Sequence, residues 1–361
     1  MNTPPERRAL SEAFALHREF LWGLCYRMTG SAADAEDLVQ DTFERALQRP
    51  PAELAGLRPW LSRVALNVSC DHLRRRKLQP YRGTFLPEPV ASGRLQAGGS
   101  GAASDARYEL LESTTFAFLL ALEALRPKER AVLLLRDVFD YSVHEAAEAL
   151  SLSEPNIKTL LHRARQRMAV YDQRRCLPSA SLSKRTEHAI KRFVLHLATD
   201  NVRGIEAMLR DDVLELTDPG EFVAARKQIR GRDKVVLFIR KVTRLAQCHG
   251  QLGRMGLIEV NGLPALLSEI DPARTDFAPR HLFVFDVDEQ GRVERIYALL
   301  ASRKLARLDG TALRGVNRLE RVVLRAVRFV VALWQRPEKR LSKHIQVHAR
   351  SRVRPGQPLQ E

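Results

Sequence analysis

Cysteines and long apolar runs are scarce in this sequence. The 361 residues hold four cysteines, Cys25, Cys70, Cys176 and Cys248, with no CxxC pair and no histidine pair beside them. This spacing excludes a disulfide-stapled scaffold and a Cys/His zinc motif, and it predicts reduced thiols in a cytoplasmic protein. No stretch approaches the roughly 20 apolar residues of a membrane span, and residues 1–8 lack the apolar core of a signal peptide.

Acidic side chains are outnumbered by basic ones. The chain has 59 Lys and Arg against 43 Asp and Glu, a formal net charge of +16. This balance favours a polyanionic partner such as nucleic acid. The positive charge is concentrated in residues 311–361, where basic side chains far outnumber acidic ones.

Residues 31–48 predict an amphipathic helix whose outer face is acidic. Apolar residues recur at i, i+3, i+4 and i+7 from Ala35 to Leu47, and Ser31 stands at the N-cap position. The outward row contains Asp34, Asp37, Asp41 and Glu44. Such a face suits a basic partner protein and would repel a phosphate backbone.

A second helix is predicted from Arg58 to Lys77, with Pro59 in its first turn. Its inward row is apolar, whereas Trp60, Arg63, Asn67 and Arg74 recur on another face. Aromatic, amide and cationic groups together suit opened or single-stranded nucleic acid, because they supply stacking planes and phosphate contacts.

The next segments predict a linker and a helix-turn-helix. Residues 80–105 are rich in Gly, Pro, Ser and Ala, which indicates a flexible tether. Helices are then predicted over 108–125, 127–138 and 142–150. After a three-residue turn, a longer helix begins with Ser153 as its cap and carries a basic outer face.

From residue 184 the pattern changes to α+β. Two amphipathic helices precede a strand at 213–217 and a helix at 231–244, and two hairpins follow, the first turning at Asn261-Gly262. Residues 313–334 have one apolar and one arginine-rich side. Two interpretations of that helix stay open: packing on the preceding domain, or contact with nucleic acid or a membrane surface.

These segments resemble the extracytoplasmic-function family of bacterial sigma factors. The motifs similar to sigma region two and region four are Leu24–Gly30, Asp34–Phe43, Leu57–Leu61, Asn67, Asp71–Arg76, Tyr141–Ala147 and Ile157–Arg165. Leu86-Pro87-Glu88-Pro89 matches the linker motif of the group that carries a SnoaL-like cone domain. Two further motifs of that group are only partly kept, as Asp218–Phe222 and Ala301–Leu305.

The resemblance implies a multidomain protein with two all-α sigma domains, an α+β SnoaL-like domain and a basic C-terminal helix. The expected units are residues 1–79 for region two, 80–107 for the linker, 108–176 for region four, 184–308 for the cone, and 309–361 for the extension. The implied partners are core RNA polymerase and promoter DNA. No cofactor, metal or catalytic residue is expected, and the sequence identifies no anti-sigma factor.

The resemblance also implies roles for individual residues. Those expected to bind polymerase are Asp34, Asp37, Gln40 and Asp41. Those expected to bind the minus-ten element are Trp60, Arg63, Asn67, Arg74 and Arg75. Those expected to bind the minus-thirty-five element are Asn156, Lys158, Thr159, Arg163 and Arg165. Those expected to regulate the sigma regions in cis are Phe85, Leu86, Pro87, Glu88, Pro89 and Asp218.

Two other functions stay open at this point. The cone could be a ligand sensor or a cyclase- or isomerase-type enzyme, with Asp218, His249 and His281 as the available acid or base. Alternatively, the chain could be a helix-turn-helix regulator that binds duplex DNA without polymerase. The acidic helix argues against the regulator, because it would leave that face without a role.

Overall fold

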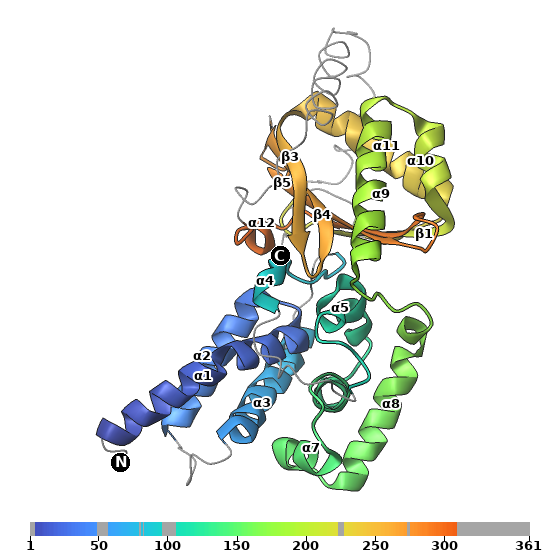
Figure 1. Ribbon diagram of the computed structural model, residues 1–361. Coiled ribbons are helices and arrows are strands. Elements are labelled where there is room, and N and C mark those ends of the chain that lie inside the picture. Colours follow the sequence, from blue (N-terminus) through green and yellow to red (C-terminus); the bar gives the residue numbers. More distant parts are fainter. Residues whose placement is uncertain are drawn as a thin grey trace, which may run out of the picture.

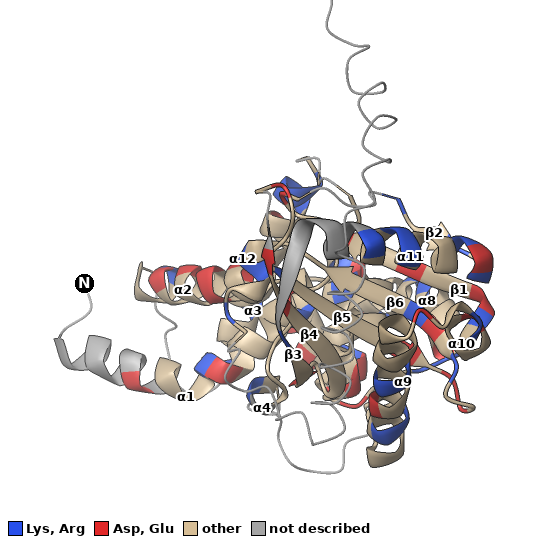
Figure 2. Cartoon of the chain, turned by 90° about the horizontal axis from the view of Figure 1, so that it is seen from above, with Lys and Arg blue, Asp and Glu red and all other residues tan. Residues whose placement is uncertain are grey.

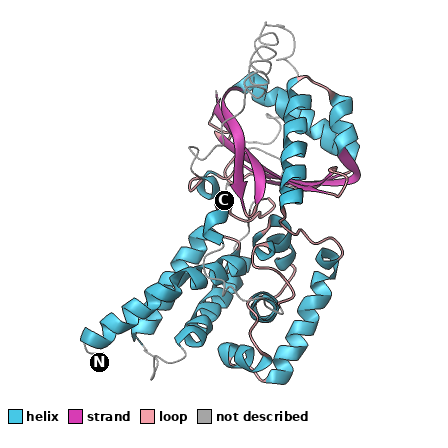
Figure 3. Ribbon diagram, in the orientation of Figure 1, coloured by secondary structure: helices cyan, strands magenta, loops and turns pink. Residues whose placement is uncertain are grey.

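The computed structural model describes residues 4–48, 57–78, 81, 83–95, 106–222, 227–272 and 275–308. These residues form a helical body followed by a curved six-stranded sheet with helices on one face (Figure 1). This is the predicted order of all-α units before an α+β unit, and Figure 3 shows the division by element type. The basic helix predicted within residues 309–361 lies outside the described residues. None of the described helices combines the length and apolar character that a bilayer span needs.

The first helical unit consists of α1 (Pro4–Thr29), α2 (Ala32–Gln48) and α3 (Leu57–Lys77). All three helices contact one another and bury the predicted apolar rows, including Leu38 and Leu61. Gly30 joins α1 to α2 with φ of +68°, and a Cβ there would lie 3.4 Å from the ring of Phe85. The tight turn and the close approach both explain the glycine.

The second helical unit consists of η1 (Glu112–Thr114), α5 (Phe116–Leu122), α6 (Pro127–Leu133), one π-helical turn η2 (Leu134–Val138), α7 (Val143–Leu150) and α8 (Glu154–Asp172). The predicted single helix over 108–125 is wrong. Glu112 is fully buried and accepts hydrogen bonds from Tyr171 Oη and Arg175 Nε, at 2.7 and 2.8 Å, so the chain bends to bring it inward.

The helix-turn-helix is present as predicted. Ser142 and Glu145 form a capping box at the start of α7, and Ser151 ends the helix in the left-handed conformation with φ of 52°. Ser153 stands at the N-cap position of α8, but its side chain makes no capping hydrogen bond. The short turn therefore fixes α8 across α7.

The sheet domain contains α9 (Ala180–Ala198), α10 (Val202–Met208), β1 (Leu209–Asp218), β2 (Ile229–Arg230), α11 (Arg232–His249), β3 (Gly250–Val260), β4 (Leu263–Pro272), β5 (Arg280–Val287), β6 (Val293–Leu299) and α12 (Ser302–Leu305). Its strand order is β2-β1-β6-β5-β4-β3. Both predicted hairpins, β3–β4 and β5–β6, are confirmed. The short strand β2 and the parallel pairing of β1 with β6 were not predicted.

Each face of the sheet has its own apolar cluster. On one face, Ile190 and Phe193 of α9 pack with Phe285 and Ile296 of the sheet. On the opposite face, Tyr297 and Leu299 pack with Leu86 of the linker and Phe116 of α5. The second face is therefore covered by the helical body rather than by solvent.

The two helical units share one continuous hydrophobic core rather than forming separate globules. Arg130 of α6 donates to the Met28 carbonyl at 2.5 Å, and Arg27 Nε donates to Ser113 Oγ at 2.7 Å. The described part of the linker is also ordered: residues 84–95 include the buried Leu86 and Glu88 and end in α4 (Ser92–Leu95). The flexible tether predicted from composition is therefore wrong for this stretch, while residues 96–105 lie outside the described part.

Candidate functional site

The outer face of α2 is acidic and open to solvent. Asp37, Gln40 and Asp41 are exposed, and in Figure 2 several red segments, which mark Asp and Glu, recur along α2. Asp34 differs, because its carboxylate is half-buried and lies 3.2 Å from Nε2 of His72. Burial would raise the pKa of Asp34, but His72, together with Ser31 and Arg76, lowers it below its ordinary value. Asp34 therefore ties α2 to α3 within the first unit.

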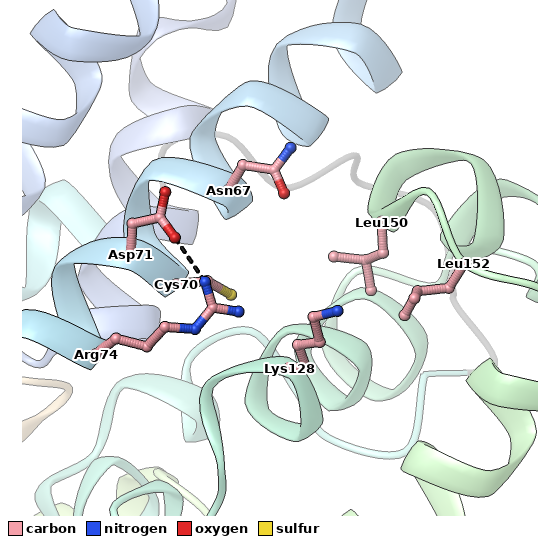
Figure 4. A pocket seen from close by; sticks show the side chains of 7 residues that line it. All are labelled: Asn67, Cys70, Asp71, Arg74, Lys128, Leu150 and Leu152. Atoms are coloured by element: carbon pink, nitrogen blue, oxygen red, sulfur yellow. Dashed lines mark hydrogen bonds and ion pairs between the residues drawn. The ribbon is translucent and has the colours of Figure 1, made fainter.

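The predicted nucleic-acid face of α3 is only partly free. Asn67, Arg74 and Arg75 are exposed, whereas Trp60 and Arg63 are half-buried, and Trp60 packs against the core. Asn67 and Arg74 line a pocket of about 300 Å³ together with Lys128, Leu150 and Leu152 of the second unit. Figure 4 shows Asn67 and the guanidinium group of Arg74 on the side of α3 that faces these residues, and Arg74 pairs with Asp71 at 2.6 Å. This face of α3 therefore borders the second helical unit.

The outer face of α8 is exposed at Asn156, Lys158, Thr159 and Arg163. Arg165 is held differently. Its Nε and Nη2 donate to the buried Asp137 carboxylate at 2.9 and 2.6 Å, and this hydrogen bonding raises the pKa of Arg165. The structure therefore gives Arg165 a role in joining α8 to η2, which its helical spacing did not reveal.

Two of the predicted regulatory residues, Leu86 and Asp218, meet at one buried point. The carboxylate of Asp218, at the end of β1, has no exposed surface and accepts hydrogen bonds from Tyr81 Oη at 2.7 Å and Leu86 N at 3.2 Å. Lys304 Nζ of α12 donates to the same carboxylate at 2.6 Å and to the Leu86 carbonyl at 2.5 Å. We call Asp218, Lys304 and the Leu86 peptide the linker clamp.

The aromatic and acidic residues of the linker motif have partners of their own. Lys304 Nζ lies 3.9 Å from the centroid of the Phe85 ring, and the Arg76 guanidinium lies 4.4 Å from it. The Glu88 carboxylate accepts from Ala33 N at 3.1 Å and so caps the start of α2. The linker thus touches the sheet domain and the helix that carries the acidic face.

Lys304 was not among the predicted site residues. Its signal in the sequence was the Lys304-Leu305 pair, the part of the C-terminal motif that this chain keeps. Burial lowers the pKa of Lys304, against the opposing pull of Asp218. A buried lysine of this kind depends on its carboxylate partner, which is why the two belong to one site.

The three residues considered as acid or base of an enzyme have different surroundings. Asp218 is engaged by the linker, the side chain of His249 lies outside the described part of the chain, and burial lowers the pKa of His281 to about 4. The sheet face under α9 instead holds Glu215, which is 2% exposed, next to its donor Thr217. Among the described residues, Glu215 Oε2 has no hydrogen-bond partner, and no cluster of His, Cys, Asp and Glu could hold a metal.

Comparisons with known proteins match both helical units. The model of Sigma-70 region 2 matches residues 13–79, and the model of Sigma-70 region 4 matches residues 115–168. The chain is 33% identical over 277 residues to the ECF RNA polymerase sigma factor SigJ of Mycobacterium tuberculosis, covering 72% of this chain and 86% of SigJ. It is 37% identical over 175 residues to SigG of the same species, covering 42% of this chain and 45% of SigG.

The similarity to SigJ extends beyond the helical units. The crystal structure of Mycobacterium tuberculosis SigJ superposes with a TM-score of 0.56 at 26% identity, covering 82% of this chain and 98% of that one. The match therefore includes the sheet domain as well as the two helical units.

The buried Glu215 predicts a pH-dependent stability. Burial raises the pKa of Glu215 from 4.5 to about 7. Between these values the folded chain binds more protons than the unfolded chain, so stability falls as the pH rises, by about 3 kcal/mol in all. Glu215→Gln should remove this fall in urea unfolding measured from pH 4 to pH 8. The exposed Glu289→Gln serves as the control, and an unchanged pH profile in Glu215→Gln would contradict the assignment.

Proposed function

Because the chain belongs to the extracytoplasmic-function RNA polymerase sigma factors, we propose that it binds core RNA polymerase and directs it to specific promoters. The work is binding, so no catalytic group is needed, and the chain acts without a cofactor and not as an enzyme. The observation that carries this proposal is the presence of both sigma regions in order, each with a polar face open to solvent.

The polymerase surface is the acidic face of α2. Asp37, Gln40 and Asp41 are exposed side by side on a helix whose other side is buried in the core. Such a surface contributes chiefly through charge complementarity, which speeds association and fixes orientation. Asp34 supports this face from within the chain, through His72.

The DNA surfaces lie on α3 and α8. Asn67, Arg74 and Arg75 on α3 provide an amide and two cations for the melted minus-ten element. Asn156, Lys158, Thr159 and Arg163 on α8 face outward for the minus-thirty-five element, as expected for the second helix of a helix-turn-helix.

The compact arrangement must open before both elements can be bound. The minus-ten and minus-thirty-five elements are, by their names, about 25 base pairs apart, which is roughly 85 Å along the DNA at 3.4 Å per base pair. In the structure α3 packs on α6 and α6 packs on α8. At about 8–10 Å per helix contact, α3 and α8 are separated by only about 20 Å there. We therefore take the described arrangement as the closed state.

The sheet domain regulates the sigma regions in cis by holding this closed state. It binds the linker through the linker clamp and covers the apolar Leu86 and Phe116. A domain attached to the same chain acts at high effective concentration, so modest contacts are well occupied. Deleting the domain would expose that apolar surface, so point substitutions test the regulation more cleanly than truncation.

The acidic face of α2 can be tested by charge reversal. Asp37→Lys combined with Asp41→Lys should abolish binding to core polymerase while the fold is kept, because both side chains are exposed. Affinity measured by fluorescence anisotropy should show the loss. Asp233→Lys with Glu289→Lys makes the same charge change on the sheet domain and should bind normally. Wild-type affinity of the folded α2 variant would contradict the placement of the polymerase surface on α2.

Duplex recognition by α8 can be tested at Arg163. Arg163→Ala should weaken binding to a minus-thirty-five duplex by about 1–3 kcal/mol if the guanidinium reads a base edge. The duplex would first be selected from a random pool with the wild-type chain. Arg203→Ala, an exposed arginine of α10, removes the same charge elsewhere and should leave affinity unchanged. Equal affinities for the two variants would show that Arg163 does not contact DNA.

The linker clamp can be tested at Lys304. Lys304→Met leaves the buried Asp218 carboxylate without its cation, which typically costs about 3–5 kcal/mol. We expect a lower melting temperature, faster trypsin cleavage after Arg94 in the linker, and tighter polymerase binding. The adjacent exposed Arg303→Met is the matched control. If Lys304→Met released the linker but weakened polymerase binding, the sheet domain would favour the active state instead.

A further inference from the structure

The β3–β4 hairpin ends in an unusual place for a hairpin tip. Asn261 and Gly262 form its two-residue turn with φ of 53° and 83°, the geometry that Asn-Gly sequences favour. Such turns are normally exposed, yet Asn261 is only 2% exposed. A Cβ on Gly262 would lie 3.1 Å from Leu111 and 3.5 Å from Pro178. The tip of the hairpin is therefore inserted between other parts of the chain.

The Asn261 side chain joins three separate segments. Its Oδ1 accepts from Val90 N of the linker at 2.9 Å. Its Nδ2 donates to Tyr26 Oη of α1 and to the Thr114 carbonyl of the second helical unit, both at 2.7 Å. Both hydrogens of Nδ2 are thus engaged, and only an uncharged amide can accept at one end and donate twice at the other.

Neighbouring contacts fix the same point. Asn261 N donates to the Val90 carbonyl at 2.9 Å, and Gly262 N donates to Ser92 Oγ at 2.9 Å. Tyr26, which is fully buried, donates its own hydroxyl hydrogen to the Glu88 carbonyl at 2.8 Å. The amide of Asn261 thus completes a short network that reaches from α1 through the linker to the sheet domain.

The turn itself does not need this side chain. Glycine adopts positive φ without strain, so a Gly-Gly sequence would close the hairpin equally well. The sheet domain likewise gains no internal contact from the amide, because all three side-chain hydrogen bonds leave the domain. These hydrogen bonds therefore stabilise the position of the sheet domain relative to the helical units and not the sheet domain itself.

We propose that Asn261 is an interdomain latch, a positioning residue whose amide holds the first helical unit, the linker and the second helical unit in the closed state. The proposal rests on the proposed function, since closing has a consequence only if the two sigma regions must separate. The latch is distinct from the linker clamp, because it binds different linker residues and reaches both helical units directly.

The test removes the amide without disturbing the turn. Asn261→Gly keeps the favoured backbone geometry and deletes three hydrogen bonds, so the open population should rise roughly tenfold or more. The readout is the rate of trypsin cleavage after Arg94. In the closed state Arg94 forms a 2.6 Å ion pair with Glu36 of α2, so we expect this site to be protected until the linker is released. Glu289→Gly, at the exposed turn of the β5–β6 hairpin, is the matched control and should cleave at the wild-type rate.

A second variant separates the latch from general destabilisation. Asn261→Asp is nearly isosteric and can still accept from Val90 N, but it cannot donate to Tyr26 Oη or the Thr114 carbonyl. It should open as far as Asn261→Gly. In a double-mutant cycle, Tyr26→Phe should add less to Asn261→Gly than it adds to the wild type, because the two changes remove one shared bond. Independent, additive effects would overturn the latch.

Polymerase binding then distinguishes the latch from the proposed function. Faster cleavage with tighter binding to core polymerase supports both. Faster cleavage with unchanged polymerase affinity would support the latch but contradict the proposal that opening controls polymerase binding. Wild-type cleavage rates in both Asn261→Gly and Asn261→Asp would overturn the latch while leaving the sigma assignment intact.

Discussion

The arrangement of this protein depends on one buried ion pair, in which Lys304 Nζ lies 2.6 Å from the Asp218 carboxylate. The carboxylate accepts from Leu86 N, and Lys304 donates to the Leu86 carbonyl. Burying two charges is costly unless each is fully hydrogen-bonded. Here the carboxylate accepts from Lys304 Nζ and Gly220 N of its own domain and from Tyr81 Oη and Leu86 N of the linker. Undocking the linker would therefore remove two hydrogen bonds from a buried carboxylate of the sheet domain, so the two parts depend on each other.

The docked linker lies beside two helical units that share one core, although we propose that their DNA surfaces bind separate promoter elements. The linker covers the seam between the first unit and the sheet domain, while Arg27 and Arg130 bond across the two helical units. Glu88 also caps α2, the helix that carries the acidic face. The sheet domain is thus joined to both helical units, through residues 84–95 and directly through Asn261.

The two faces of the sheet pack against different partners. One face packs on the linker and α5, whereas the other is closed by α9, α10 and α11. The second face holds Glu215, whose burial raises its pKa to about 7. A carboxyl group kept protonated near neutral pH costs stability as it ionises, so the interior of this domain is sensitive to pH. That sensitivity is separate from the linker clamp, which lies at the end of β1.

The sequence by itself determined the helices of the first unit, the helix-turn-helix, the two hairpins and the polar faces of α2 and α8, because these follow from local periodicity and short motifs. It also indicated Asp218 and the Leu86-Pro87-Glu88-Pro89 segment. It did not give the bend around the buried Glu112. Only the tertiary structure decided that Arg165 pairs with Asp137, that Lys304 completes the clamp, and that Asn261 joins three segments. These partners lie between 28 and 235 positions apart, and periodicity carries no information over such separations.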